Sequence, residues 1–115
     1  MDVREAIYGA LTADTSLTAL ADIYMNDSKN ATKVPSVVVS IVDEVPRFAD
    51  DGELITITRF QITIITRDAE YDTIESYIKK DMYDIGATRV MSTEFLNEKK
   101  HYRVVQFKIL NEVKE

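Results

Sequence analysis

The chain is predicted to fold as an α+β protein with two layers: a mainly antiparallel four-stranded sheet and two main helices on one of its faces. Two observations predict this. Two segments carry apolar residues at helical spacing, and four segments rich in β-branched residues form two pairs, each joined by a turn signal. The order is therefore helix, hairpin, helix, hairpin. A single sheet can then cover both apolar helix stripes.

Length and composition fit one soluble domain spanning residues 1–115. The absence of cysteine excludes disulfides, thiolate catalysis and thiolate metal sites, and is compatible with the cytosol. A net charge of −6 argues against a general phosphate-binding surface. Neither a signal peptide nor a membrane span is expected, because no apolar run is long enough for a span and none follows a basic start.

The first helix is predicted over Val3–Ala13, where apolar residues recur every three or four positions. Asp2 and Glu5 have the spacing of a capping box. Asp14 is a second candidate N-cap and predicts a short helical turn over 17–21.

A polar loop over 25–33 separates this region from the first predicted strand, which covers Val37–Val42. Pro46 is expected to end that strand. The connection 46–53 contains an Asp-Asp-Gly turn signal and gives the hairpin a long acidic tip.

The next strand, residues 54–67 (LITITRFQITIITR), has an apolar phase that reverses partway along. Side chains alternate between the faces of a strand, so the two groups point to opposite sides of the sheet. Fourteen residues also span about 46 Å, whereas a compact domain of this size is roughly 36 Å across. Part of the strand is therefore expected to project. The odd group is Ile55 and Ile57. The even group, Phe60, Ile62 and Ile64, is expected to lie beneath the helices.

Two interpretations of this phase change remain open. A bulge near Thr58-Arg59 would place all these residues in one core. Alternatively, an outer apolar patch on a projecting arm contacts a neighbour. Counting back from the loop pairs Val45 with Leu54, Val39 with Phe60, Val37 with Ile62, and Val42 with Ile57. The candidate oligomer-interface residues are Val42, Phe48, Ile55 and Ile57.

The second main helix is predicted over residues 69–85, with Asp68 as N-cap and Gly86 as C-cap. Two closing strands, 88–95 and 102–110, follow, joined by a turn at 97–100. The residues of the apolar helix stripe are Tyr71, Ile74, Ile78, Met82 and Ile85.

No catalytic residue, cofactor site or metal site is predicted. The three glycines form no phosphate-binding loop, and the single histidine, His101, fits a solvated hairpin residue better than a base. Asp68, Glu70 and Asp72 begin like a calcium loop, but Thr73 and Lys79 occupy positions that need glycine and glutamate.

Two smaller charged groups are also better explained without a ligand. The acids of the hairpin tip, Asp50, Asp51 and Glu53, fit a solvated turn better than a cation site. The one basic cluster is a weak nucleic-acid candidate because no exposed aromatics are interleaved with it. It comprises Lys99, Lys100, His101 and Arg103.

The order of these signals resembles that of the small tail-completion proteins of tailed bacteriophages, also called tail terminators or head–tail joining proteins. The resemblance covers nearly the whole chain and depends on a diffuse pattern. Its parts are the VREAIYGALTAD helix, the SLTALA turn, the short Ile23-Tyr24 segment, the polar loop, Pro35 with its valine-rich strand, the turn at Asp51-Gly52, FQITIITRD, YDTIESYIKKDMYDIG and the closing hairpin.

The resemblance implies a structural subunit of a phage or prophage with no enzymatic activity. Such subunits form homo-oligomeric rings, commonly hexamers, that join the tail tube to the head connector and let DNA pass without specific binding. The protein would be found in virions and, during assembly, in the host cytoplasm. The alternatives from the residues alone are a cytosolic oligomeric ligand-binding or regulatory α+β domain and a small enzyme using dispersed carboxylates.

Overall fold

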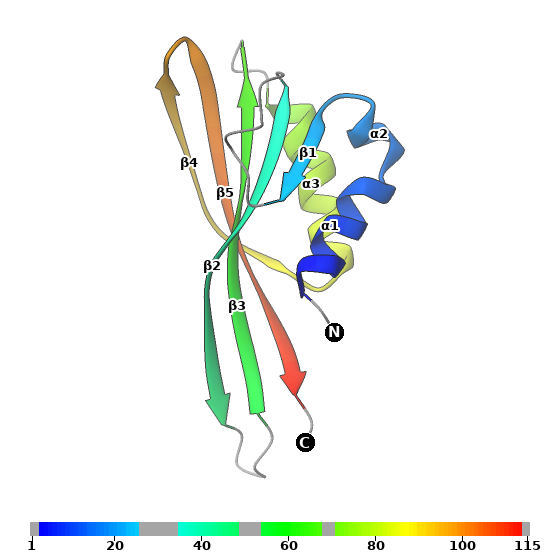
Figure 1. The fold of residues 1–115 in the computed structure, drawn as a ribbon, viewed down its shortest axis with the longest axis vertical. Coiled ribbons are helices and arrows are strands. Elements are labelled where there is room, and N and C mark those ends of the chain that lie inside the picture. The colour runs from blue at the N-terminus through cyan, green and yellow to red at the C-terminus, as the bar shows by residue number, and fades with distance from the viewer. Residues whose placement is uncertain (1–2, 26–34, 49–53, 68–70, 114–115) are drawn as a thin grey trace.

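The computed structural model describes residues 3–25, 35–48, 54–67 and 71–113. They form an α+β fold with a mixed, mainly antiparallel sheet of five strands, in the order β1-β2-β3-β5-β4 (Figure 1). The α+β class is confirmed, but the predicted number of four strands is wrong. The elements are α1 (Val3–Ala13), α2 (Thr15–Thr18), β1 (Asp22–Met25), β2 (Ser36–Phe48), β3 (Leu54–Thr66), α3 (Asp72–Asp84), β4 (Thr88–Asn97) and β5 (Lys100–Val113).

The additional strand, β1, is four residues long and pairs in parallel with the start of β2. Its partner is more than ten residues away along the chain, so no turn signal marks the pair. A segment this short also shows little alternation. These two facts explain why the sequence pattern did not predict it.

Both N-terminal helices form, but α2, Thr15–Thr18, begins two residues and ends three residues before the predicted turn over 17–21. The observed bounds of α1 are the predicted ones, and Ile7 and Leu11 supply its buried side. Asp14 caps α2, because its Oδ1 accepts hydrogen bonds from the backbone N–H groups of Ser16 and Leu17. Asp2 lies outside the described residues.

The third helix begins later than predicted, at Asp72 and not at residue 69. Tyr71 occupies the N-cap position and makes no side-chain capping bond, while the predicted cap, Asp68, lies outside the described residues. At the other end Gly86 has a φ of +92° and the backbone N–H of Ala87 donates to the Met82 carbonyl. This Schellman geometry confirms the predicted C-cap glycine.

The helices pack against one face of the sheet over a single large apolar cluster. Phe60, Ile62 and Ile64 are fully buried there, as predicted, and Phe60 stacks on Phe107 with ring centroids 5.6 Å apart. The other core residues are Ile7, Leu11, Leu17, Ala21, Val37, Val39, Tyr71, Ile74, Ile78, Met82, Ala87, Val105 and Ile109.

Strand β2 does not end at Pro46, contrary to the prediction, but runs on to Phe48. Beyond Val39 it has no outer partner within the described parts of the chain, because β1 pairs only with residues 36–39. Proline lacks an N–H and is tolerated on such an edge. The hairpin connection is shorter than predicted for the same reason, since β3 begins at Leu54.

The predicted register between β2 and β3 is also wrong. Val37 pairs with Ile64, and Val45 with Ile57, so the pairing is displaced by two residues near the core and by three near the tip. The change occurs at a bulge in β2 at Val42, between Ile41 and Asp43. A displacement of two keeps every side chain on its face, which is why Val37 and Val39 still enter the predicted core.

Strand β3 itself is regular, so the alternative of a bulge near Thr58-Arg59 that brings all the apolar residues into one core is wrong. Ile55 and Ile57 are half-buried and lie outside the core clusters. They belong to an arm, formed by residues 42–48, 54–59 and 108–113, that extends beyond the helices (Figure 1). The arm has three strands, and the molecule measures 51 × 27 × 23 Å.

The closing hairpin turns at Glu98-Lys99, within the predicted turn. Both residues have positive φ, 50° and 66°, as a two-residue type I′ turn requires. Neither is asparagine or glycine, the residues that adopt this conformation most easily. The left-handed region costs an ordinary residue about 1–2 kcal/mol.

Replacing the turn by Glu98→Asn with Lys99→Gly should therefore stabilise the protein. We expect a gain of about 1 kcal/mol, or roughly 4 °C in the midpoint of thermal unfolding measured by circular dichroism. Glu98→Ala with Lys99→Ala is the control, because it removes the same two charges without easing the backbone. A double variant no more stable than that control would contradict the strain argument.

Candidate interaction surface

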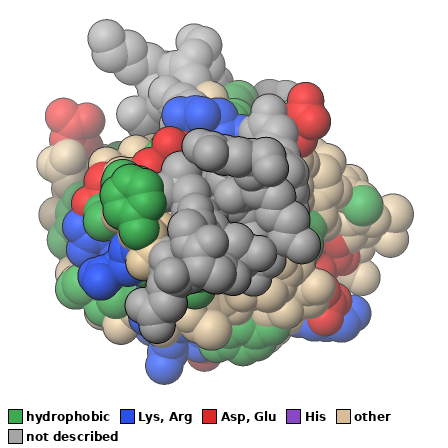
Figure 2. Space-filling model, turned by 90° about the horizontal axis from the view of Figure 1, so that it is seen from below, with side chains coloured by type: hydrophobic (Ala, Val, Ile, Leu, Met, Phe, Trp, Pro, Cys, Tyr) green, Lys and Arg blue, Asp and Glu red, His purple; other side chains and the backbone are tan. Residues whose placement is uncertain are grey.

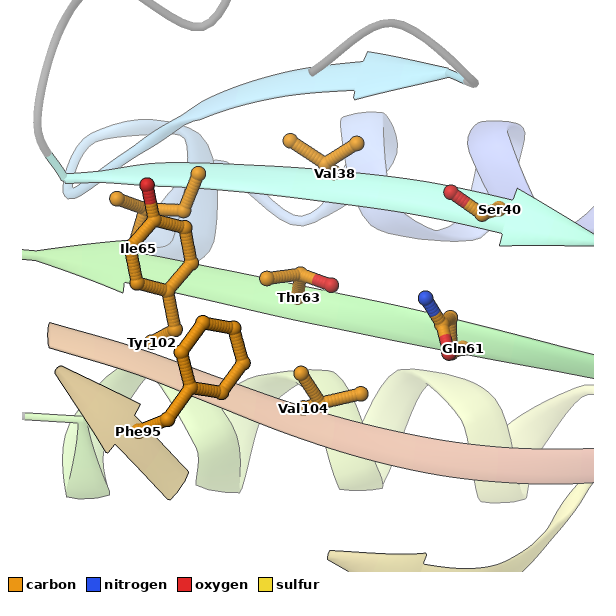
Figure 3. Close-up of a pocket in the computed structure, with 8 residues that line it drawn as sticks. All are labelled: Val38, Ser40, Gln61, Thr63, Ile65, Phe95, Tyr102 and Val104. Carbon is orange, nitrogen blue, oxygen red and sulfur yellow. The ribbon is translucent and has the colours of Figure 1, made fainter. Parts of the chain in front are cut away.

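The face of the sheet opposite the helices, called here the helix-free face, holds a groove of about 420 Å³. Figure 3 shows its floor formed by β2, β3 and β5, with Phe95 of β4 at one side. Its lining residues are Val38, Ser40, Gln61, Thr63, Ile65, Phe95, Tyr102 and Val104.

Aromatic stacking fixes one end of the groove. The rings of Phe95 and Tyr102 lie 4.8 Å apart with an interplanar angle of 4°, across a directly paired position of β4 and β5. Tyr102 packs against Val38 and Ile65, which form a second small apolar cluster on this face (Figure 3). Half of the Phe95 side chain remains exposed.

The polar groups of the groove are uncharged: Ser40, Gln61 and Thr63. Hydroxyl and amide groups can hydrogen-bond a partner but supply no strong nucleophile or base without an activating neighbour. The lining therefore has the chemistry of a contact surface that mixes apolar area with hydrogen-bonding groups.

The arm continues the helix-free face with an apolar row of Val45, Ile57 and Leu110, paired directly across three strands. Leu110 is 57% exposed and Val45 is 38% exposed. Seen from the arm end, apolar side chains reach the surface among charged ones (Figure 2).

The structure separates the four predicted interface residues. Ile55 and Ile57 lie on the helix-free face of the arm, but Val42 occupies the bulge and does not pair with Ile57 as predicted. Phe48 is 83% exposed and, by its register with Leu54, lies on the opposite face of the arm.

Val45 and Leu110 were not predicted as members of the apolar row. Leu110 could have been found from the sequence, because Val104 and Leu110 are out of phase with the core residues Val105, Phe107 and Ile109. Strand β5 thus carries the same two-faced pattern as β3.

A charged row separates the groove from the apolar row of the arm: Asp43, Arg59 and Lys108 are paired across β2, β3 and β5. The guanidinium of Arg59 donates two hydrogen bonds to the Asp43 carboxylate. These bonds hold the pKa of Asp43 below its ordinary value. The pair is exposed and screened, so its role is to fix side chains next to the bulge more than to add stability.

An ion-pair network centred on the buried Glu75 attaches α3 to the sheet on the other face. Arg103 Nε donates to Glu75 Oε1 at 2.7 Å and Nη1 donates to Glu94 Oε1 at 2.8 Å. Lys79 lies 3.3 Å from the other oxygen of Glu75. Burial favours a higher pKa for Glu75, but the hydrogen bonds from Arg103 and Lys79 outweigh burial and lower it.

This network divides the predicted basic cluster. Arg103 is held by carboxylates on the helix side, whereas Lys100 alternates to the same side as Tyr102. The cluster therefore does not form one basic surface, and its weak prediction as a nucleic-acid site gains no support from the geometry.

Two carboxyl groups meet where α2 packs on α3. Asp81 is buried, and its Oδ2 has no hydrogen-bond partner. Burial, a hydrogen bond with Asp14 and the charge of Asp14 raise the pKa of Asp81 to about 7. The same hydrogen bond lowers the pKa of Asp14, so Asp81 keeps the proton and donates the hydrogen bond, which Asp14 accepts. These acids lie outside the groove, so they do not supply the acid pair that a carboxylate enzyme would need there.

Among the described residues, no group of three or more His, Asp or Glu side chains could hold a metal ion. The acids of the hairpin tip lie outside this part of the chain, as do Asp68 and Glu70. No helix within the described ranges is long and apolar enough to cross a membrane.

Known proteins resemble this chain in structure but not in sequence. Neither the protein-family models nor the curated proteins contain a match. A chain of the virion of a native gene transfer agent particle aligns with a TM-score of 0.67 and 19% identity, covering 96% of this chain and 95% of that chain. The gp17 protein of bacteriophage SPP1 aligns with a TM-score of 0.53 and 17% identity, over 96% and 90%.

The chain shares its fold with these two proteins. The likeness covers helices and sheet together, because nearly the whole of each chain takes part. At this identity, what is shared is the fold.

The Asp14–Asp81 pair predicts a stability that depends on pH. Because folding raises the pKa of Asp81, its contribution is full below about pH 4 and is lost as the pH rises through 7. Asp81→Asn cannot ionise, so we expect it to exceed the parent by roughly 2 kcal/mol in free energy of unfolding at pH 8.5 and to match it near pH 4.5.

Urea unfolding at a series of pH values measures this difference. Asp72→Asn on the exposed first turn of the same helix is the control for removing one carboxylate from α3. Parallel curves for the parent and Asp81→Asn would show that Asp81 does not keep its proton in the folded state.

Proposed function

We propose that this protein is a tail-completion, or head–tail joining, subunit of a phage or prophage, with a structural and non-catalytic role. The observation that carries the proposal is the fold likeness, over nearly the whole chain, to a bacteriophage protein and to a component of a gene transfer agent virion. The order of sequence signals supports the same family independently. In that role the protein joins the tail tube to the head connector, and DNA passes through without specific binding.

The proposed subunits associate as a ring, with six as the number typical of the resembling family. Support comes from the helix-free face, where an apolar groove and an apolar arm row reach the surface of the isolated chain. Exposed apolar area of this kind on an uncovered sheet face is typical of a protein–protein interaction site. The proposed interface residues of this face on the arm are Val45, Ile55, Ile57 and Leu110; Val42 at the bulge and Phe48 on the opposite face of the arm stay in the proposal as separate contacts.

A second function is favoured by one specific observation, the groove itself. Its volume is within the range of small-molecule sites, and three uncharged polar side chains line it. A cytosolic oligomeric ligand-binding domain would use this space. The groove has a flat floor of three strands, which suits a packed protein surface better than a site that must enclose a small molecule (Figure 3).

Imaging of the purified protein tests the ring. Concentrated protein in negative stain should show annular particles of uniform size, and mass photometry should give the number of subunits. A protein that stays monomeric at all concentrations, and that does not add to isolated tails of its own phage or prophage, would contradict the proposal. A small molecule that raises the unfolding midpoint and is displaced by groove substitutions would favour the second function.

The variant Ile57→Asp tests whether the apolar row of the arm lies in a subunit interface. Burying an isoleucine side chain contributes about 1.5–3 kcal/mol, and a carboxylate placed there must also be desolvated. Assembly should therefore need at least tenfold more protein, measured by light scattering over a concentration series. The folded monomer should keep its circular dichroism spectrum.

Thr56→Asp is the matched control, because the neighbouring residue points to the other face of the same strand. It introduces the same charge at nearly the same height on the arm. Equal loss of assembly in both variants would indicate a general effect of charge, and unchanged assembly in Ile57→Asp would remove this row from the interface.

A further inference from the structure

The two faces of the molecule carry opposite charge. On the helix-free face the described side chains include four basic and two acidic residues, assigned by strand register and alternation. This excess of positive charge occurs in a chain whose net charge is −6. The basic residues are Arg47, Arg59, Lys100 and Lys108, and the acidic ones are Asp22 and Asp43.

The helix layer, defined here as α1, α2, α3 and Asp14, has the reverse balance. It contains six acidic and three basic residues. Three large apolar side chains are also exposed on or beside these helices: Tyr8, Leu20 and Tyr83, at 41%, 42% and 51%. The acidic residues are Glu5, Asp14, Asp72, Glu75, Asp81 and Asp84. Asp81 is buried and keeps its proton, and Glu75 is buried in ion pairs with Lys79 and Arg103. The charge at the surface therefore comes from the other four acids against Arg4 and Lys80.

We infer that the helix-free face, with its groove, receives the helix layer of a second copy of this chain. The inference rests on the proposed ring and names which two surfaces meet in it. The opposite charges of the two surfaces indicate which surface of the second copy binds the helix-free face. The acidic helix layer meets the basic face, and its exposed tyrosines meet a groove lined by Phe95, Tyr102 and uncharged polar groups.

The opposite arrangement, with two helix-free faces in contact, would bring like charges together. Such a contact would also be self-complementary and would end at a dimer. A contact between two different surfaces is heterologous, so each copy still presents one free surface of each kind. Repetition of that contact closes a ring when the rotation between copies allows it.

The absence of cysteine makes a direct test possible, because an introduced thiol is the only one in the chain. Thr93→Cys places a thiol on exposed β4 beside Val104 of the groove. Ser76→Cys places one on exposed α3, seven residues and so about two turns before Tyr83. Both substitutions replace small side chains and remove none of the proposed apolar contacts.

A short bis-maleimide is added to each variant alone and to an equal mixture. We expect a covalent dimer in the mixture and at least fivefold less in either single variant. Glu98→Cys, at the turn joining β4 and β5, is the control thiol and should give no excess with either partner. Dimers of Thr93→Cys alone would overturn the inference in favour of face-to-face packing.

The outcomes separate this inference from the proposed function. Rings without the mixed cross-link overturn only the choice of surfaces. The mixed cross-link without rings supports the contact and contradicts the ring. If the protein remains monomeric at millimolar concentration, both the contact between these two surfaces and the proposed ring are wrong.

Charge reversal supplies an independent measurement. Lys100→Glu with Lys108→Glu should raise the concentration for half-assembly about tenfold at low salt. Adding Asp72→Lys and Asp84→Lys to the same chain should recover most of that loss. Failure of the fourfold variant to recover, while its circular dichroism shows it folded, would overturn the assignment of these surfaces.

Discussion

The pairing of β3 with β2 and β5 along its entire length determines the rest of this structure. All thirteen residues of β3 have a partner in β5, and all but the bulge position of β2 is matched on the other side. One continuous strand therefore forms both the floor of the helix-covered core and the centre of the arm. The helices cover only part of its length, because their apolar stripes fit only the Phe60–Ile64 half.

Much of this could be predicted from residues alone, because alternation is a local property. The phase reversal in β3 correctly indicated apolar side chains on both faces of the sheet, and the glycine after α3 correctly indicated its end. Register could not be predicted, because it depends on where the bulge at Val42 lies and on a turn whose conformation the residue types do not determine. Strand β1 was missed because its pairing is parallel and distant.

The candidate surface was harder to predict than the core. The groove needs residues from four strands, and only the complete strand order places Phe95 beside Tyr102 and Val38 near Ile65. The net charge was also misleading for this surface, because a total of −6 for the chain conceals one face with an excess of positive charge. The apolar part of the helix-free face could have been predicted from the second apolar phase of β5, which β3 shares.

The continuity of β3 also has a mechanical consequence. A force applied along the arm runs nearly parallel to the strands, so it loads the interstrand hydrogen bonds on both sides of β3 in shear, many at once. Bonds loaded together must break together, whereas bonds at a hinge would break one after another. The arm is therefore a stiff lever fixed in the core, and tension on its tip is carried to Phe60 and Phe107 without a flexible joint between.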